Sequence, residues 1–294
     1  MQPLAKKPKI VESKGEFLNL RACAATDIGK RNNNEDSFLM NENIGLYMVA
    51  DGMGGGDMGE FASWFATRKV EEIMSLKHGV DEFSFDSNIL RTADNLTDEA
   101  HMRYAVWSAN VNLRAEAIKR ELTKTGTTLA AIFFKGNKAY IANIGDSRCY
   151  RISYGKLDLV THDHSIVARR LRTGDITRRG FKRAKGRNLI TRTIGADESA
   201  EADSYVLTVY PREKFLLCTD GLYNVVDEKT ILKYTDKFDI EPACEKLVTL
   251  ARDSGGRDNI TAVLVEVANV GKTEASTVSS DRKNISGPDD DTIT

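Results

Sequence analysis

The sequence predicts an α+β fold in which helices cover antiparallel sheets. Short runs of β-branched and apolar residues follow one another along the chain and are joined by turns such as those at 135–137 and 153–155. Strands separated by so few residues pair antiparallel, because a parallel crossover needs about a dozen residues or more. Segments with helical spacing of apolar residues lie between these runs, and a length of 294 residues is enough for one large domain or two modest ones.

The predicted strands are short apolar runs bounded by polar or turn-forming residues. In chain order, the clearest runs are Leu46–Ala50, Leu129–Phe134, Ala139–Ile144, Phe215–Cys218 and Ile260–Val267. All of them are far shorter than the roughly 18 apolar residues that span a bilayer. We therefore expect no membrane-spanning segment and no membrane partner.

The predicted helices are recognised by apolar residues three or four positions apart. This spacing is found at Phe61, Trp64 and Phe65, and again at Trp107, Val111, Ala115, Ile118 and Leu122. A third helix is expected to carry Cys244, Leu247, Val248 and Ala251 on one face. Pro242 marks the start of the last helix and Gly255-Gly256 its end, because proline fits the first helical turn and glycine stops a helix.

Charge and cysteine content indicate where the protein works. The 42 Lys plus Arg nearly balance the 43 Asp plus Glu, and a formal net charge of −1 gives no reason to expect nucleic acid as a partner. The four cysteines, Cys23, Cys149, Cys218 and Cys244, lack metal-ligand spacing. We interpret them as buried free thiols, which predicts a reducing compartment and a cytoplasmic location.

The two ends of the chain differ from its middle. Residues 1–16 are a polar, basic extension without the apolar core of a secretory signal, and frayed backbone is expected up to about Lys14. Residues 269–294 contain almost no large apolar residue and are predicted to be disordered. Residues 17–268 remain as the folded domain, and the lack of a heptad repeat predicts a monomer.

Aspartates stand at the ends of several predicted strands. These residues are Asp36, Asp51, Asp146, Asp220 and Asp258. Partly desolvated carboxylates repel one another, so such a group is tolerated mainly when cations bind it. Oxygen ligands without nearby His or Cys favour Mg²⁺ or Mn²⁺. Gly52, next to Asp51, lets the backbone approach an ion. The alternative for each aspartate singly is that it caps a turn, as Asp-Gly pairs often do.

Several motifs match one family in its order, over roughly residues 17–268. They are Thr26-Asp27-Ile28-Gly29, Arg31, Asn34-Glu35-Asp36, Val49-Ala50-Asp51-Gly52-Met53-Gly54-Gly55, Gly126-Thr127-Thr128-Leu129, Ala142-Asn143-Ile144-Gly145-Asp146-Ser147-Arg148, Asp163-His164-Ser165, Thr191-Arg192-Thr193-Ile194-Gly195, Thr219-Asp220-Gly221-Leu222 and Arg257-Asp258-Asn259-Ile260-Thr261. The chain resembles the metal-dependent serine/threonine protein phosphatases of type 2C, in their bacterial form.

This resemblance implies a four-layer α-β-β-α sandwich of two antiparallel sheets with a small flap subdomain. It also implies two Mn²⁺ or Mg²⁺ ions and a possible weaker third ion. Their implied ligands are Asp36, Asp51, the Gly52 carbonyl, Asp220 and Asp258, with Asp146 and Asp220 at the third ion. The implied catalytic residues are Arg31, Asp36 and Asp51, and Arg31 would hold the substrate phosphate. The implied reaction is hydrolysis of phosphoserine and phosphothreonine by a metal-bridging hydroxide, in phosphoproteins modified by an opposing Ser/Thr kinase.

The chain departs from the family pattern at a few positions. One residue, Lys30, separates Gly29 from Arg31 where many relatives have two. Met53 stands where animal relatives have a histidine proposed as general acid, and residues 181–187 contain no histidine either. The sequence therefore identifies no general acid for the leaving group.

Two segments have more than one interpretation. The flap, at about 165–188, begins with a short helix that includes Val167 and Leu171 and ends at Gly174. Lys and Arg dominate 169–187, so the flap either selects acidic substrates or is a solvated hairpin. The polar stretch 76–97 is either a partner-docking insert or a surface loop.

Two other functions stay open at this point. The first is a catalytically weak relative that binds phosphoproteins as a regulatory module. The second is a related phosphatase for small-molecule or nucleic-acid phosphates. Retention of the aspartates and Arg31 favours the protein phosphatase over the regulatory module, because loss of metal ligands is typical of inactive relatives.

Overall fold

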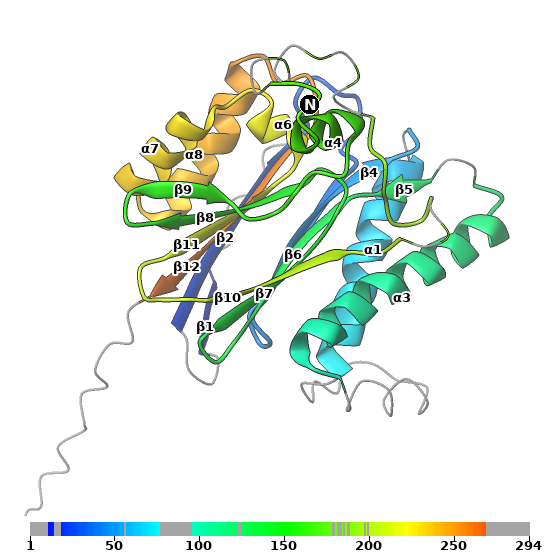
Figure 1. Cartoon of the computed structure of the whole chain (residues 1–294), viewed down its shortest axis with the longest axis horizontal. Coiled ribbons are helices and arrows are strands. Elements are labelled where there is room, and N and C mark those ends of the chain that lie inside the picture. The colour runs from blue at the N-terminus through cyan, green and yellow to red at the C-terminus, as the bar shows by residue number, and fades with distance from the viewer. Residues whose placement is uncertain are drawn as a thin grey trace, which may run out of the picture.

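The structure is a computed structural model of the whole chain (Figure 1). It describes residues 11–14, 19–55, 57–76, 96–122, 125–177, 180, 184, 186, 189–196, 198 and 200–268. The C-terminal segment 269–294 and much of the flap lie outside this part of the chain, as do residues 77–95.

One sheet brings together strands from both ends of the domain. Its strand order is β1-β2-β12-β11-β8-β9, and all of its neighbouring strands pair antiparallel. The strands are β1 (Val11–Lys14), β2 (Asn19–Asp27), β8 (Arg148–Ser153), β9 (Lys156–Leu159), β11 (Lys214–Cys218) and β12 (Ile260–Ala268). Because β1 pairs with β2, the expectation of frayed backbone up to Lys14 is wrong for 11–14.

The second sheet is built mainly from strands of the first half of the chain. Its order is β10-β7-β6-β4-β3, again antiparallel, with β5 paired to the end of β4. The strands are β3 (Asp36–Asn41), β4 (Leu46–Met53), β5 (Gly126–Thr127), β6 (Leu129–Lys135), β7 (Lys138–Ile144) and β10 (Asp203–Thr208). The apolar runs predicted as strands all lie inside these elements.

Helices cover the outer face of each sheet, which confirms the four-layer arrangement (Figure 1). The long helices α1 (Asp57–Leu76) and α3 (Asp98–Lys119) cover the second sheet, and α7 (Glu228–Lys237) and α8 (Ile240–Asp253) cover the first. Two short helices, α4 (Ile166–Arg172) and α6 (Asp220–Tyr223), follow strand ends. The predicted α+β class is therefore confirmed, and so is the short helix that opens the flap.

The core has three apolar layers because side chains alternate along each strand. In β12, Val263 and Val265 point between the two sheets, whereas Ala262 and Leu264 point toward α8. In β4, Val49 packs between the sheets and Met48 packs toward α1 and α3. Both faces of the central strands are buried, which explains why these strands are near-continuous apolar runs in the sequence.

The first two predicted helices both exist, although some of the apolar residues with helical spacing are exposed. In α1, Ala62, Ala66 and Val70 are buried and Trp64 is exposed. In α3, the face with Trp107 points outward, and the helix ends before Leu122. Both helices carry apolar residues around much of their circumference, so apolar spacing alone does not identify the buried side. The face predicted for the last helix is confirmed.

The cysteine prediction is confirmed, since all four cysteines are free and buried. In the described ranges, no helix is both long and apolar enough to cross a membrane.

Candidate metal centre

The predicted aspartates come from strand ends that meet at one edge of the two sheets. Asp36 begins β3 and lies directly opposite Asp51 of β4 in the antiparallel register. Asp220 follows β11 as the first residue of α6, Asp146 follows β7, and Asp258 precedes β12. Chain segments far apart in sequence therefore bring these carboxylates into one neighbourhood.

Burial and mutual repulsion raise the pKa values of Asp36, Asp51, Asp146 and Asp220. Desolvation raises the pKa of Asp36 to about 7, that of Asp146 to about 8 and that of Asp220 to about 6. The pKa of Asp51 is raised well above its usual range by burial and then by Asp36. Its remaining neighbours in the cluster raise it further: Asp220, Asp146 and Asp258. A cluster of this kind favours either protons or cations between its oxygens.

Asp36 is oriented by two threonine hydroxyls from the other sheet. Thr219 and Thr261 both donate to Asp36 Oδ2, at 2.8 and 2.7 Å. Since the Thr261 proton goes to Asp36, Thr26 must donate the 2.9 Å bond that joins its hydroxyl to Thr261. Asn34 completes this chain by donating to the Thr26 hydroxyl at 3.0 Å. These hydrogen bonds fix the position of Asp36 Oδ2, so the other carboxylate oxygen of Asp36 also has a defined direction.

The donor set fits hard divalent cations in its chemistry. Asp36 Oδ1 and Asp220 Oδ1 are buried carboxylate oxygens without a hydrogen-bond partner among the described residues. An unpaired buried carboxylate oxygen is costly, and a cation is the partner that removes this cost. A Cβ at position 52 would clash with the Gly59 carbonyl oxygen, so only glycine fits beside Asp51. These observations support the set that the sequence predicted.

The ligand sphere is not closed in this arrangement. Within the described ranges, no three His, Cys, Asp or Glu side chains converge as ligands of one ion would. Two other oxygens of the cluster are held by hydrogen bonds: Asn224 donates to Asp220 Oδ2 at 2.9 Å, and Arg31 donates to Asp258 Oδ2 at 2.8 Å. Side-chain rotation would be needed to bring the free oxygens onto one ion.

Arg31 lies at the rim of the cluster, where a substrate phosphate could reach it. Its guanidinium donates to Asp258 and to the Arg257 carbonyl oxygen, and its side chain is about half exposed. The turn that carries Arg31 is shaped by Gly29, which adopts a positive φ of 61°. A planar guanidinium suits bidentate binding of a phosphate better than a lysine would.

A second layer of residues supports Asp146, and none of them was assigned a role in the site from the sequence. Tyr223 donates to the Asp146 carbonyl oxygen at 2.9 Å. Arg148 makes a buried bidentate pair with Asp163 and lies 3.6 Å from the Tyr223 ring centroid. The backbone N–H of Gly145, next to Asp146, donates to His164 Nδ1 at 3.1 Å. The motifs at 145–148 and 163–165 were the signal for this layer.

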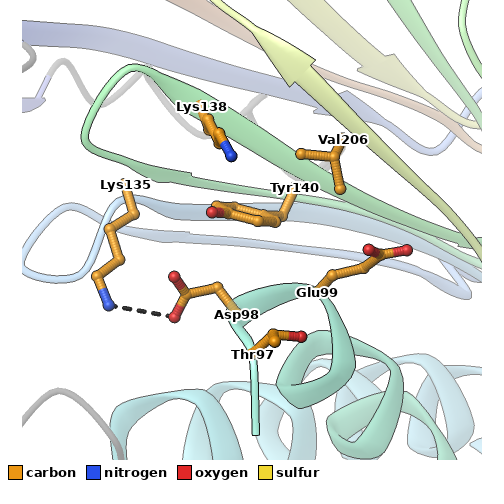
Figure 2. Close-up of a pocket in the computed structure, with 7 residues that line it drawn as sticks. All are labelled: Thr97, Asp98, Glu99, Lys135, Lys138, Tyr140 and Val206. Atoms are coloured by element: carbon orange, nitrogen blue, oxygen red, sulfur yellow. Dashed lines mark hydrogen bonds and ion pairs between the residues drawn. The ribbon is translucent and has the colours of Figure 1, made fainter.

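A cleft of about 470 Å³ lies elsewhere on the molecule, at the start of α3 (Figure 2). Its lining residues are Thr97, Asp98, Glu99, Lys135, Lys138, Tyr140 and Val206. Lys135 pairs with Asp98 at 3.1 Å. Lys138 begins β7 whereas Asp146 follows the end of that strand, so the cleft is separate from the metal centre.

Comparison with known proteins decides the family. The sequence profile of the family described as Protein phosphatase 2C matches residues 25–264. The chain belongs to the protein phosphatase 2C family. It is 34% identical over 250 residues to the serine/threonine phosphatase Stp of Listeria welshimeri, an alignment that covers 82% of this chain and 93% of that protein.

Solved structures of the phosphatase 2C family share the fold. The serine/threonine phosphatase PstP of Mycobacterium tuberculosis is similar with a TM-score of 0.74 and 31% identity, covering 85% of this chain and 99% of that one. A structure of the PstP catalytic domain in complex with two manganese ions is similar with a TM-score of 0.71 and 31% identity, with the same coverage. The predicted architecture is therefore that of solved family members.

Loss of the Thr261 hydroxyl is expected to weaken metal binding. Thr261→Val keeps the shape of this buried side chain but removes one donor to Asp36 and breaks the link to Thr26. We expect Mn²⁺ affinity, measured by isothermal titration calorimetry, to fall by about 10- to 100-fold, as for other residues that orient metal ligands. Thr235→Val is the matched control, because its equally buried hydroxyl donates to carbonyl oxygens of its own helix. Equal affinity in both variants would contradict the orienting role.

Proposed function

We propose that the chain is a metal-dependent protein serine/threonine phosphatase, the activity typical of its family. The observation that carries the proposal is the pair of buried carboxylate oxygens, Asp36 Oδ1 and Asp220 Oδ1, that have no partner among the described residues. They lie within a cluster of aspartates at the positions that the resemblance to the family assigns to metal ligands. Mn²⁺ or Mg²⁺ is the proposed cofactor, with two ions in the core and a weaker third near Asp146.

Each part of the site has a proposed role. Asp36, Asp51, the Gly52 carbonyl, Asp220 and Asp258 would hold the core ions. Bound divalent ions would supply a nucleophile from water near neutral pH and neutralise phosphate charge. Thr219 and Thr261 keep Asp36 oriented, which lowers the reorganisation needed when the site is filled. Arg31 would bind the phosphate oxygens and stabilise the charge that develops on them.

A cysteine-dependent mechanism is disfavoured by the environment of the thiols. Burial raises the pKa of Cys218 to about 12 and also raises the pKa of Cys149. The pKa of Cys23 is raised by its hydrogen bond with Cys244 and then by burial. A thiol attacks phosphorus only as thiolate, and catalytic cysteines therefore have lowered pKa values. All four cysteines are buried, so none is accessible to a phosphoprotein.

The deciding experiment is hydrolysis of phosphothreonine, phosphoserine and phosphotyrosine peptides by the full chain with Mn²⁺, Mg²⁺ or EDTA. We expect release of phosphate from the first two peptides, dependent on a divalent ion and abolished by EDTA. Activity that survives EDTA would contradict the metal-dependent mechanism. Binding of phosphopeptides without hydrolysis under any metal condition would instead identify the regulatory relative.

The remaining proposals concern the setting of the enzyme. We propose phosphorylated proteins as substrates, an opposing Ser/Thr kinase, a monomeric state and a cytoplasmic location. Free buried cysteines support a reducing compartment. The exposed Arg169 and Arg170 of α4 support a preference for acidic substrate segments.

A further inference from the structure

The chain passes from the second sheet to the first at a tight turn that carries Asp146. Residues 145–147 connect the end of β7 with the start of β8, and these two strands belong to different sheets. Gly145 begins the turn with a positive φ of 95°, and Asp146 and Ser147 follow it as buried residues. We call these three residues the crossover turn. Its position determines where the Asp146 carboxyl group lies relative to the rest of the metal centre.

Two side chains from other parts of the fold hold the backbone of the crossover turn. His164 Nδ1 accepts from the Gly145 N–H at 3.1 Å, and the His164 N–H donates to the Gly145 carbonyl oxygen at 2.8 Å. The Tyr223 hydroxyl donates to the Asp146 carbonyl oxygen at 2.9 Å. These bonds fix the shape of the turn, but they do not connect it to Asp51.

Thr128 holds the backbone of Asp51. This fully buried residue lies between β5 and β6. The Asp51 N–H donates to the Thr128 hydroxyl at 2.9 Å, and the Thr128 N–H donates to the Asp51 carbonyl oxygen at 2.9 Å. The hydroxyl of the neighbouring Thr127 donates to the same carbonyl oxygen, also at 2.9 Å. Both polar groups of the Asp51 backbone are therefore bound by one short segment.

The same Thr128 hydroxyl reaches the crossover turn. Its oxygen lies 2.6 Å from the Ser147 hydroxyl oxygen, in a buried hydrogen bond in which either group can donate the proton. The methyl group of Thr128 also packs against the turn, since a Cβ at position 145 would lie 2.6 Å from both Cβ and Cγ2 of Thr128. One buried side chain therefore contacts the Asp51 backbone and the crossover turn at the same time.

We propose that Thr128 is a positioning residue that holds Asp51 and Asp146 at a fixed separation. Asp51 belongs to the proposed core site and Asp146 to the proposed weaker third site, so one hydroxyl group joins the two parts of the metal centre. Ligands that are fixed before an ion arrives need less reorganisation when it binds. The inference rests on the proposed function, because the ions themselves belong to that proposal.

A positioning role and a packing role predict opposite results for two conservative variants. Thr128→Val keeps the shape and the methyl groups but removes the hydroxyl, which leaves the Asp51 N–H and the Ser147 hydroxyl without this partner. Thr128→Ser keeps the hydroxyl and removes the methyl group that packs against Gly145. If Thr128 only fills space, serine is the more damaging substitution. If Thr128 positions the two aspartates, valine is the more damaging one.

Isothermal titration calorimetry of the full chain with Mn²⁺ distinguishes the two roles. We expect Thr128→Val to lower the Mn²⁺ affinity by about 10- to 100-fold, as for other residues that orient metal ligands, and Thr128→Ser to bind like the wild type. Thr235→Val, which loses an equally buried hydroxyl within α7, is the matched control and should also bind like the wild type. Wild-type affinity in Thr128→Val would overturn the proposal, and so would an equal loss in Thr128→Ser.

Ser147→Ala tests the link from its other end and leaves the bonds between Thr128 and Asp51 in place. We expect it to lower the affinity of the weaker ion by about tenfold and to leave the core ions unaffected. In the Thr128→Val background it should change nothing further, because the bond that it removes is already lost. An unaffected Ser147→Ala variant, or the same loss in both backgrounds, would contradict the link. Ser147→Ala alone decides the question if Thr128→Val fails to fold in EDTA.

These measurements are independent of phosphatase activity, because they follow the binding of Mn²⁺ alone. A wild-type chain that binds Mn²⁺ without hydrolysing phosphopeptides would contradict the proposed function and leave the comparison of variants intact. An active wild type whose Thr128→Val variant binds Mn²⁺ equally well would contradict the positioning role alone.

Discussion

Asp220→Asn is expected to lower the metal-dependent hydrolysis of a phosphothreonine peptide by more than about a hundredfold, since even residues that only orient metal ligands cost 10- to 100-fold. Asparagine keeps the size of the side chain and can still bond to Asn224. It removes the negative charge and replaces one carboxylate oxygen with an amide group that binds a cation poorly. The fold should be retained, because Asp220 lies in a short helix whose backbone bonds do not use the side chain.

The measurement is kcat/KM for the peptide at saturating Mn²⁺, together with thermal unfolding to confirm the fold. Asp236→Asn is the matched control, because Asp236 is an exposed acid of α7, on the far side of the first sheet. Its activity should equal that of the wild type. An Asp220→Asn variant with more than about a tenth of wild-type activity would show that the residue is not a ligand of the core ions.

The signals from which the sequence predicts a metal centre are local. Each aspartate stands next to a glycine or at the edge of an apolar run, and both features can be recognised without knowledge of the fold. The strand pairing that unites them is not local: Asp36 and Thr261 are 225 positions apart. Apolar periodicity contains no information about such pairs, so the threonines that orient Asp36 could not be assigned from the sequence.

The helices show a second limit of local signals. The apolar side chains of α3 lie on two sides of the helix, and their spacing predicts a helix without indicating which side is buried. The structure buries the side with Ala105, Ala109 and Leu113, which packs with α1 and the second sheet. Trp107 and Ile118 are left on the exposed side.

The stability of the protein in EDTA is expected to fall as pH rises from about 5 to about 8, and Mn²⁺ is expected to reverse this trend. In the folded chain the raised pKa values keep Asp36, Asp146 and Asp220 protonated up to about pH 7, 8 and 6. In the unfolded chain aspartate loses its proton near pH 4, as a rough value. Between these limits the folded state binds more protons, so the free energy of unfolding decreases with rising pH.

Mn²⁺ competes with those protons, so its stabilising effect must grow as they leave. At a concentration of about 100 times its Kd, an ion adds roughly 2.7 kcal/mol to the free energy of unfolding, which for a domain of this size raises Tm by about 5–10 °C. Differential scanning calorimetry across this pH range should show that increase near pH 8 and little of it near pH 5. Asp220→Asn should lose most of the Mn²⁺ effect at every pH. If Mn²⁺ raised Tm equally at both ends of the range, the buried aspartates could not be the groups that bind it.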